Sequence, residues 1–250
     1  MMCNMEKTEV IIKIEKLHKQ FGTNVVLNGF DLELREGENL VVMGKSGSGK
    51  SVMIKCIIGL ENYQGGSIKV ADKEISELDR KELDELRTDI GFLFQGSALY
   101  DSMSVRENLE FPLRRHPKKI GKLTDTTPLV LEALESVGLA HAIDLMPNEL
   151  SGGMKRRIAL ARTLILKPTI ILYDEPTTGL DPITSKEIIL LMQSIQKKYN
   201  TSSIIITHDV DCAKAIANRM ILLIDGLNYA EGTFEALQAA TDPKIKAFFK

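Results

Sequence analysis

Short apolar runs alternate with longer segments of mixed polarity along most of the chain. The apolar runs have strand length and occupy residues 40–43, 90–94, 169–173 and 203–207. Runs this short, bounded by polar and turn-forming residues, are typical of buried strands. Amphipathic helical patterns begin at Lys50 and Pro182, after the first and third runs. The pattern predicts an α/β fold in which buried strands alternate with helices.

Strand patterns of another kind flank the first buried run. Residues 10–17 are β-branched and partly alternating, and a second pattern passes through Phe30, Leu32 and Leu34 after a predicted turn at residues 28–29. Residues 65–75 predict a further short hairpin. We therefore expect an antiparallel β-subdomain in the N-terminal part of the chain. Between its first two strands, Phe21 lies on a predicted loop, where it could stack on an adenine ring or pack in the core.

Helical patterns replace strands between about residues 96 and 167. A capping box, Ser104 to Glu107, starts one helix, Thr127 and Pro128 start another over residues 129–137, and a third is expected over residues 155–166. A basic linker at residues 114–119 is either a solvated loop or a contact with a partner or lipid. We expect a helical lobe inserted between strands, followed by a hairpin over residues 220–231 and two short helices over residues 233–249.

Composition limits the functional classes. The 250 residues, 44% apolar, suffice for one large domain with an inserted lobe, which we place at residues 1–250. The net charge of −2, with neither half strongly basic, argues against nucleic acid as a ligand. Three cysteines without metal-ligand spacing are typical of reduced thiols, and no apolar run reaches the roughly 18 residues of a membrane helix. We expect a soluble, cytoplasmic protein.

A phosphate-binding loop follows the first buried strand. Residues 44–51 match G-x-x-x-x-G-K-S between a predicted strand and a predicted helix. Small residues there allow successive backbone N–H groups to surround phosphate oxygens, and the helix N-terminus adds a positive dipole. Lys50 is expected to reach the β- and γ-phosphates and Ser51 to hold magnesium. The nucleotide-binding candidates are Gly44, Lys45, Ser46, Gly47, Ser48, Gly49, Lys50 and Ser51.

Two carboxylates, Asp174 and Glu175, end the third buried strand. Ligands of open α/β sheets bind at the carboxyl ends of strands. Because side chains alternate along a strand, Asp174 is expected to face magnesium and Glu175 an attacking water. His208 ends another strand of the same predicted sheet. A second anion-binding candidate, Ser151, Gly152 and Gly153, starts the helix expected at residues 155–166.

Together, these motifs resemble those of ATP-binding-cassette (ABC) ATPases, which have a RecA-like P-loop NTPase core. The phosphate loop, Gln95, residues 150–153, residues 170–175, residues 180–181 and His208 occur in that family's order, and Phe21 matches its adenine-stacking position. Residues 94–105 and 147–154 resemble more narrowly the ATPase subunits of Mla-type phospholipid transporters, which serve MCE-protein systems. Met154, where most cassettes carry Gln, is familiar in that subset.

The resemblance implies a head-to-tail homodimer that closes on ATP and Mg²⁺. Each ATP would contact one subunit's phosphate loop and the other subunit's residues 151–153, and Asp181 is a further nucleotide-binding candidate. Ser51, Asp174 and Gln95 would hold magnesium, and Glu175, His208, Lys50 and Gln95 would act in hydrolysis.

The implied partners are integral membrane permeases on the inner face of the cytoplasmic membrane, an MCE-type lipid-binding protein and, left open, a small accessory subunit. Leu99, Tyr100 and Met103 are expected to contact a permease, or else the protein's own helical lobe. The alternatives are an ATPase of another small-solute transporter and a non-transport ATPase of the iron–sulfur-assembly type, which would share the catalytic residues.

Overall fold

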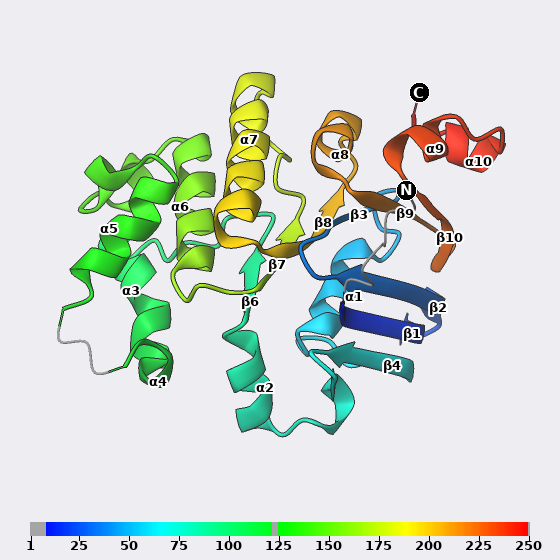
Figure 1. The fold of residues 1–250 in the computed structure, drawn as a ribbon, viewed down its shortest axis with the longest axis horizontal. Coiled ribbons are helices and arrows are strands. Elements are labelled where there is room, and N and C mark those ends of the chain that lie inside the picture. Colours follow the sequence, from blue (N-terminus) through cyan, green and yellow to red (C-terminus); the bar gives the residue numbers. More distant parts are fainter. Residues whose placement is uncertain (1–8, 122–124, 250) are drawn as a thin grey trace, which may run out of the picture.

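A six-stranded sheet forms the centre of the protein, for which the computed structural model describes residues 9–121 and 125–249 (Figure 1). The strand order is β10-β9-β3-β8-β7-β6, with all neighbours parallel except β10, which pairs antiparallel with β9. The strands are Asn39–Met43 (β3), Ile90–Leu93 (β6), Ile170–Asp174 (β7), Ser202–Thr207 (β8), Arg219–Ile224 (β9) and Leu227–Gly232 (β10).

A second, antiparallel sheet confirms the predicted β-subdomain. Its order is β2-β1-β4-β5, with strands Val10–Phe21 (β1), Asn24–Arg35 (β2), Gly65–Val70 (β4) and Lys73–Glu74 (β5). The predicted turn at residues 28–29 is wrong. The hairpin turns at Gly22 and Thr23 instead, so Phe21 ends β1 rather than lying on a loop. Asn28 is a strand residue whose N–H donates to the carbonyl of Gly226.

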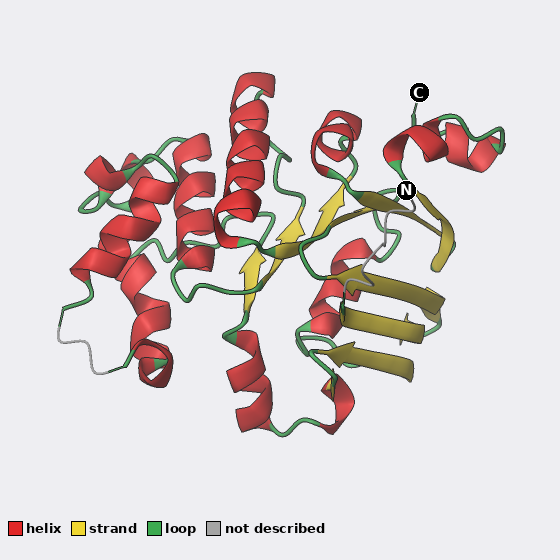
Figure 2. Ribbon diagram, viewed as in Figure 1, coloured by secondary structure: helices red, strands yellow, loops and turns green. Residues whose placement is uncertain are grey.

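Helices cover both faces of the parallel sheet (Figure 2). Helix α1 lies between the two sheets, whereas α7 and α8 lie on the opposite face (Figure 1). The helices are Lys50–Ile57 (α1), Arg80–Arg87 (α2), Val105–Arg115 (α3), Pro117–Ile120 (α4), Thr127–Ser136 (α5), Gly152–Leu164 (α6), Pro182–Tyr199 (α7), Val210–Ile216 (α8), Phe234–Gln238 (α9) and Pro243–Lys246 (α10). Three short 3-10 turns occur at Ile75–Glu77, Ala140–Ala142 and Pro147–Glu149.

Alternation along the buried strands divides the apolar side chains between two cores. Val42 and Leu172 face α1 and the antiparallel sheet, whereas their neighbours Val41 and Tyr173 face α6 to α8. Both sets are fully or almost fully buried. Because each strand is covered on both faces, it reads as a continuous apolar run rather than as an alternating one.

The segment between β6 and β7 contains helices but, in its described part, no strand. The predicted capping box is present, with Ser104 Oγ accepting from the N–H of Glu107 and the Glu107 carboxylate accepting from the N–H of Ser104. The predicted basic linker is wrong, because α3 continues through Arg115 and only His116 separates it from α4. Two of the basic side chains there have acidic partners: Arg114 pairs with Glu110 and Lys119 with Asp89.

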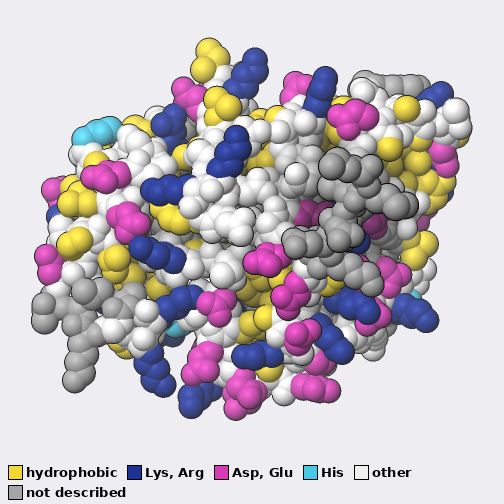
Figure 3. Space-filling model, in the orientation of Figure 1, with side chains coloured by type: hydrophobic (Ala, Val, Ile, Leu, Met, Phe, Trp, Pro, Cys, Tyr) yellow, Lys and Arg dark blue, Asp and Glu magenta, His cyan; other side chains and the backbone are white. Residues whose placement is uncertain are grey.

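Acidic and basic side chains are interspersed on the face shown in Figure 3. None of the described helices combines the length and apolar character needed to cross a membrane.

Truncation of a leucine should destabilise the protein much more on a buried strand than on the exposed surface of a helix. Leu172, on β7, is 0% exposed, whereas Leu190, on α7, is 64% exposed. We expect Leu172→Ala to lower the free energy of unfolding by about 2–5 kcal/mol, because it leaves a cavity between α1 and the sheet. Leu190→Ala, the matched control, should change it by less than about 0.5 kcal/mol. Urea denaturation followed by circular dichroism measures both, and equal losses would contradict this description of the core.

Candidate functional site

The loop between β3 and α1 has a shape that only glycines allow at two positions. Gly47 and Gly49 have φ angles of +77° and +103°. A Cβ at Gly49 would lie 2.6 Å from Val26 Cγ1, and one at Gly44 would lie 2.9 Å from the carbonyl oxygen of Leu223. Ser48 Oγ is buried without a hydrogen-bond partner. An unsatisfied buried hydroxyl beside the N-terminus of a helix fits a loop that binds phosphate oxygens.

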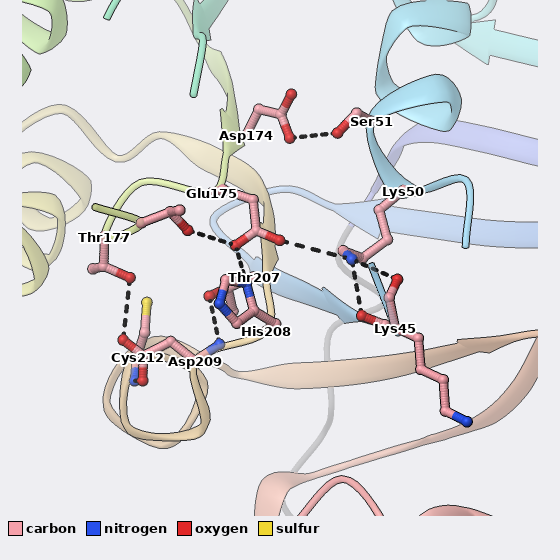
Figure 4. Close-up of polar contacts among 12 residues, drawn as sticks. Lys45, Lys50, Ser51, Asp174, Glu175, Thr177, Thr207, His208, Asp209 and Cys212 are labelled. Carbon is pink, nitrogen blue, oxygen red and sulfur yellow. Dashed lines mark hydrogen bonds and ion pairs between the residues drawn. The ribbon is translucent and has the colours of Figure 1, made fainter. Parts of the chain in front are cut away.

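The side chain of Lys50, the first residue of α1, folds back into this loop. Its Nζ donates to the carbonyls of Gly44 and Lys45, at 2.8 and 3.1 Å, and lies 3.7 Å from Glu175 Oε1 (Figure 4). The side chain is 6% exposed. Burial lowers the pKa of Lys50, and the carboxylates of Glu175 and Asp174 oppose that shift. The ammonium therefore has neutral carbonyls as its nearest partners, and negatively charged phosphate oxygens would bind it more strongly.

Ser51 and Asp174 meet across the gap between α1 and β7. Ser51 Oγ donates to Asp174 Oδ1 at 2.8 Å. Burial raises the pKa of Asp174, and the hydrogen bond from Ser51 opposes this shift. Gln95 lines the same pocket as Ser51. A hydroxyl, a carboxylate and an amide supply oxygen ligands of the kind that Mg²⁺ prefers.

Glu175 occupies the turn directly after β7. Its φ is +52°, a strained conformation for a residue with a Cβ, and its N–H donates to the carbonyl of Ile206 on β8. In Figure 4 the side chains of Asp174 and Glu175 diverge, the first toward Ser51 and the second toward Lys50 and His208. Glu175 Oε2 accepts from Thr178 Oγ1 at 3.1 Å and lies 2.8 Å from His208 Nδ1. The carboxylate is therefore held from three sides.

The end of β8 is tied to the segment that follows Glu175. Thr177 Oγ1 donates to Asp209 Oδ2 at 3.1 Å, and Asp209 caps α8 by accepting from the N–H groups of Asp211 and Cys212. His208 stands between these contacts with its side chain 63% exposed. Burial raises the pKa of the nearby Cys212 thiol to about 12. That thiol is a packing residue rather than a nucleophile.

These residues surround one pocket of about 550 Å³, and a second pocket of about 780 Å³ continues from it. Lys45, Ser46 and Gly47 line both, together with Ala247 and Phe248 from the C-terminal segment. The first pocket extends over Lys50, Ser51, Gln95, Glu175, Thr178 and His208, and the second over residues 24–26 and 223–226. Most of the residues predicted for the site thus come together at the carboxyl ends of β3, β7 and β8.

Other predicted residues lie elsewhere. Phe21 lines neither pocket, and at 46% exposed it is not a core residue, which removes that alternative. Ser151 caps α6 by accepting from the N–H of Met154, and Asp181 caps α7 by accepting from Ile183 and Thr184. These two helix starts meet each other, since a Cβ on Gly153 would lie 2.7 Å from Thr184 Cγ2. They form a second cluster that lines neither pocket.

The segment after Gln95 packs in part on the protein's own lobe. Leu99 lies against the core cluster that contains α3 and α6, as the second of the two sequence alternatives expects. The ring of Tyr100 packs at a tilt against that of Phe111, with their centroids 5.0 Å apart, yet Tyr100 remains 43% exposed.

Several residues of the site have no clear signal in the sequence. Thr178 is one: its hydroxyl donates to the Glu175 carboxylate, three residues earlier in the chain, and a threonine at that spacing is not by itself a sign of such a contact. Asp209, beside His208, is another, because only its hydrogen bond with Thr177 shows that it belongs to the site. Nothing in the sequence predicts that Ala247 and Phe248 line the pocket, because helix packing alone brings them there.

The P-loop joins the parallel strand β3 to α1. It faces the paired carboxylates at the end of β7, which is separated from β3 by one strand, β8. This arrangement defines a P-loop nucleoside triphosphatase. Residues 27–178 match the ABC transporter family. The chain is 40% identical to the methionine import ATP-binding protein MetN of Campylobacter jejuni, over 95% of this chain and 75% of that protein. It is 38% identical to the intermembrane phospholipid transport system ATP-binding protein MlaF of Haemophilus influenzae, over 96% of this chain and 90% of that protein.

Two further comparisons agree. The chain is 38% identical to the probable ribonucleotide transport ATP-binding protein mkl of Mycobacterium leprae, over 96% of this chain and 68% of that protein. A dimeric structure of the ATP-binding cassette MJ0796, in a post-hydrolysis state with ADP and Pi, superimposes with a TM-score of 0.80 at 33% identity, covering 89% of this chain and 98% of that one. The protein belongs to the ABC transporter family and is an ATP-binding ATPase of that family, with the fold that the sequence predicts.

Proposed function

We propose that the protein is the ATP-hydrolysing subunit of a phospholipid transporter of the Mla type, with one ABC ATPase domain spanning residues 1–250 and a helical lobe at about 96–167. The observation that carries the catalytic part is the Glu175 carboxylate, held by Thr178 and His208 beside Lys50 at the mouth of the P-loop. ATP would lie along residues 44–51 with its phosphates at the N-terminus of α1. Lys50 would exchange its two carbonyl partners for phosphate oxygens.

Magnesium would bind beside Ser51, Asp174 and Gln95. The Ser51 hydroxyl and the Asp174 carboxylate would hold it, directly or through water, with Gln95 near the γ-phosphate. The ion would supply charge neutralisation for the phosphoryl group. Burial raises the pKa of Asp174, and a cation bound beside it would stabilise its charged form.

Glu175 orients and polarises the attacking water. Its left-handed backbone turns the carboxylate away from Asp174, so the two acids serve different ligands. His208, exposed on the pocket side and hydrogen-bonded to Glu175 through Nδ1, leaves Nε2 for a γ-phosphate oxygen. Phe21 would approach the adenine ring from the exposed end of β1.

A head-to-tail dimer would complete the site. Ser151, Gly152 and Gly153 lie together with Asp181 in a cluster away from the pocket of their own chain, so a second copy is needed to bring them to ATP. The MJ0796 cassette is described as dimeric, which supports this arrangement. Hydrolysis would remove the contact across the interface and let the dimer open.

One relative favours phospholipid as the transported substrate. MlaF is named for intermembrane phospholipid transport, and the chain covers 90% of its length, compared with 75% for MetN. The exposed Tyr100, beside the Gln95 loop, would contact a permease helix, and an MCE-type protein and a small accessory subunit would join the complex. A second candidate is import of a small solute, because the 40% identity to MetN is the higher of the two values.

Glu175→Gln should separate ATP binding from hydrolysis. The amide keeps the shape but cannot polarise water, so kcat should fall by a factor on the order of 10²–10⁴ while ATP affinity stays close to that of the wild type. Phosphate release and equilibrium nucleotide binding measure the two quantities. Glu187→Gln, which changes an exposed partner of Arg157 on α7, is the control and should hydrolyse ATP normally. Wild-type turnover in Glu175→Gln would exclude Glu175 as the catalytic carboxylate.

Ser151→Arg should block the dimer without blocking the P-loop. The long cation replaces a small helix cap where the partner's ATP would lie, so the variant should bind ATP yet remain monomeric in the Glu175→Gln background. Sedimentation with ATP detects the difference. Ser194→Arg, on the exposed surface of α7, should dimerise normally. ATP-dependent dimers of Ser151→Arg would rule out the head-to-tail site.

Purification from the native membrane tests the substrate. The tagged protein, extracted in mild detergent, should bring with it a polytopic permease, an MCE-type protein and phospholipid detectable by mass spectrometry, and its ATPase rate should rise in that complex. Cells that carry the untagged protein provide the control. A permease that purifies with a methionine-binding protein would favour solute import. Soluble iron–sulfur-assembly proteins alone would exclude both transport functions.

A further inference from the structure

A buried arginine on α6 connects three segments around the site. Arg156 lies five residues after the helix cap Ser151 and is 4% exposed. Its Nη1 donates to the carbonyl of Phe94 at 2.9 Å, and its Nη2 to the carbonyl of Thr178 at 3.3 Å. Its Nε is buried without a hydrogen-bond partner. Among the described residues, only main-chain carbonyls accept hydrogen bonds from the guanidinium.

This arrangement is costly for stability. Burial lowers the pKa of Arg156, and no charged group among the described residues offsets that shift. A buried cation without a carboxylate partner loses its hydration without a matching Coulombic gain, and an apolar side chain of similar length would avoid that loss. Core packing alone therefore does not account for an arginine at this position.

Both carbonyls that accept from Arg156 belong to segments of the catalytic pocket. Phe94 directly precedes Gln95, which lines the pocket. Thr178 holds Glu175 Oε2 through its own hydroxyl at 3.1 Å. The contact chain thus runs from α6 through Arg156 and the main chain of Thr178 to the side chain of Glu175. Since α6 is a continuous helix, a shift of its N-terminus moves the guanidinium with it.

We propose that Arg156 is a positioning residue that couples the start of α6 to the orientation of the Glu175 carboxylate and to the segment that carries Gln95. The inference rests on the proposed function, in which Ser151 contacts the ATP of a partner copy and Glu175 polarises water. Arg156 touches neither ATP nor water. It acts through Thr178, so that engagement of α6 by ATP sets the carboxylate in place for hydrolysis.

Substitution of Arg156 should therefore act on turnover rather than on nucleotide binding. Arg156→Met removes both donors and the charge at similar length, and we expect kcat to fall at least about tenfold, because a small misplacement of a catalytic group is costly. ATP affinity, set by the P-loop, should stay within about twofold of the wild type. Arg156→Lys, which can donate to one carbonyl, should recover part of the loss. Arg157→Met, whose arginine pairs with Glu187 on α7, is the control and should leave kcat unchanged.

A double-mutant cycle with Thr178 distinguishes positioning from a general structural role. Thr178→Val removes the hydroxyl that holds Glu175 at nearly constant shape, and it too should lower kcat about tenfold. If Arg156 acts through Thr178, the double variant should be no slower than the worse single variant, because the two changes break one chain of contacts. Multiplicative losses would overturn the proposal, as would a wild-type kcat in Arg156→Met or a parallel loss of kcat and ATP affinity.

Two controls distinguish a failed inference from a misfolded variant and from a failed proposed function: circular dichroism of each variant, and the turnover of Glu175→Gln. Should Arg156→Met not fold by circular dichroism, the cycle is run with Arg156→Lys, to which the same criteria apply. Wild type and Glu175→Gln are measured in the same phosphate-release assay. Normal turnover in Glu175→Gln would overturn the proposed function and, with it, this inference, whereas a slow Glu175→Gln beside normal Arg156 and Thr178 variants would overturn the inference alone.

Discussion

Parallel pairing of β3, β8 and β7 is the constraint on which the site depends. The register places Met43 beside Thr207, and Tyr173 beside Ile205, so the three strands end at one edge. Asp174 is the last residue of β7, Glu175 and His208 directly follow β7 and β8, and Lys50 follows β3 through the P-loop. Their side chains are thus brought together by hydrogen bonds between strands that are far apart in the chain. A change of register in any one strand would separate the groups that the chemistry needs.

Electrostatics at this edge favour a ligand that carries negative charge together with a cation. Burial lowers the pKa of Lys50 and raises the pKa of Asp174. Burial therefore destabilises the charged form of each group. Phosphate oxygens would satisfy the first group and a divalent cation the second. A ligand that binds only the folded protein and neutralises these charges would also stabilise the fold.

The helical lobe takes part in the site through its contacts rather than through its own side chains in the pocket. α6 packs with the core behind β7, and its buried arginine reaches the main chain on both sides of the pocket. The N-termini of α6 and α7 pack against each other at Gly153 and Thr184. The two helices therefore share contacts with each other, and α6 also contacts the segment that follows Glu175.

By itself, the sequence determined the elements and most of the site. Short apolar runs identify the strands, because a strand buried on both faces needs apolar residues throughout. The glycine-rich, acidic and histidine-containing segments that follow these runs identify the P-loop, Asp174, Glu175 and His208, because phosphate chemistry needs these residue types. Only the tertiary structure decided that Asn28 lies within a strand, that α3 runs through Arg115, and that Thr178 holds Glu175. Those features depend on contacts between distant segments, and no local pattern of side chains encodes them.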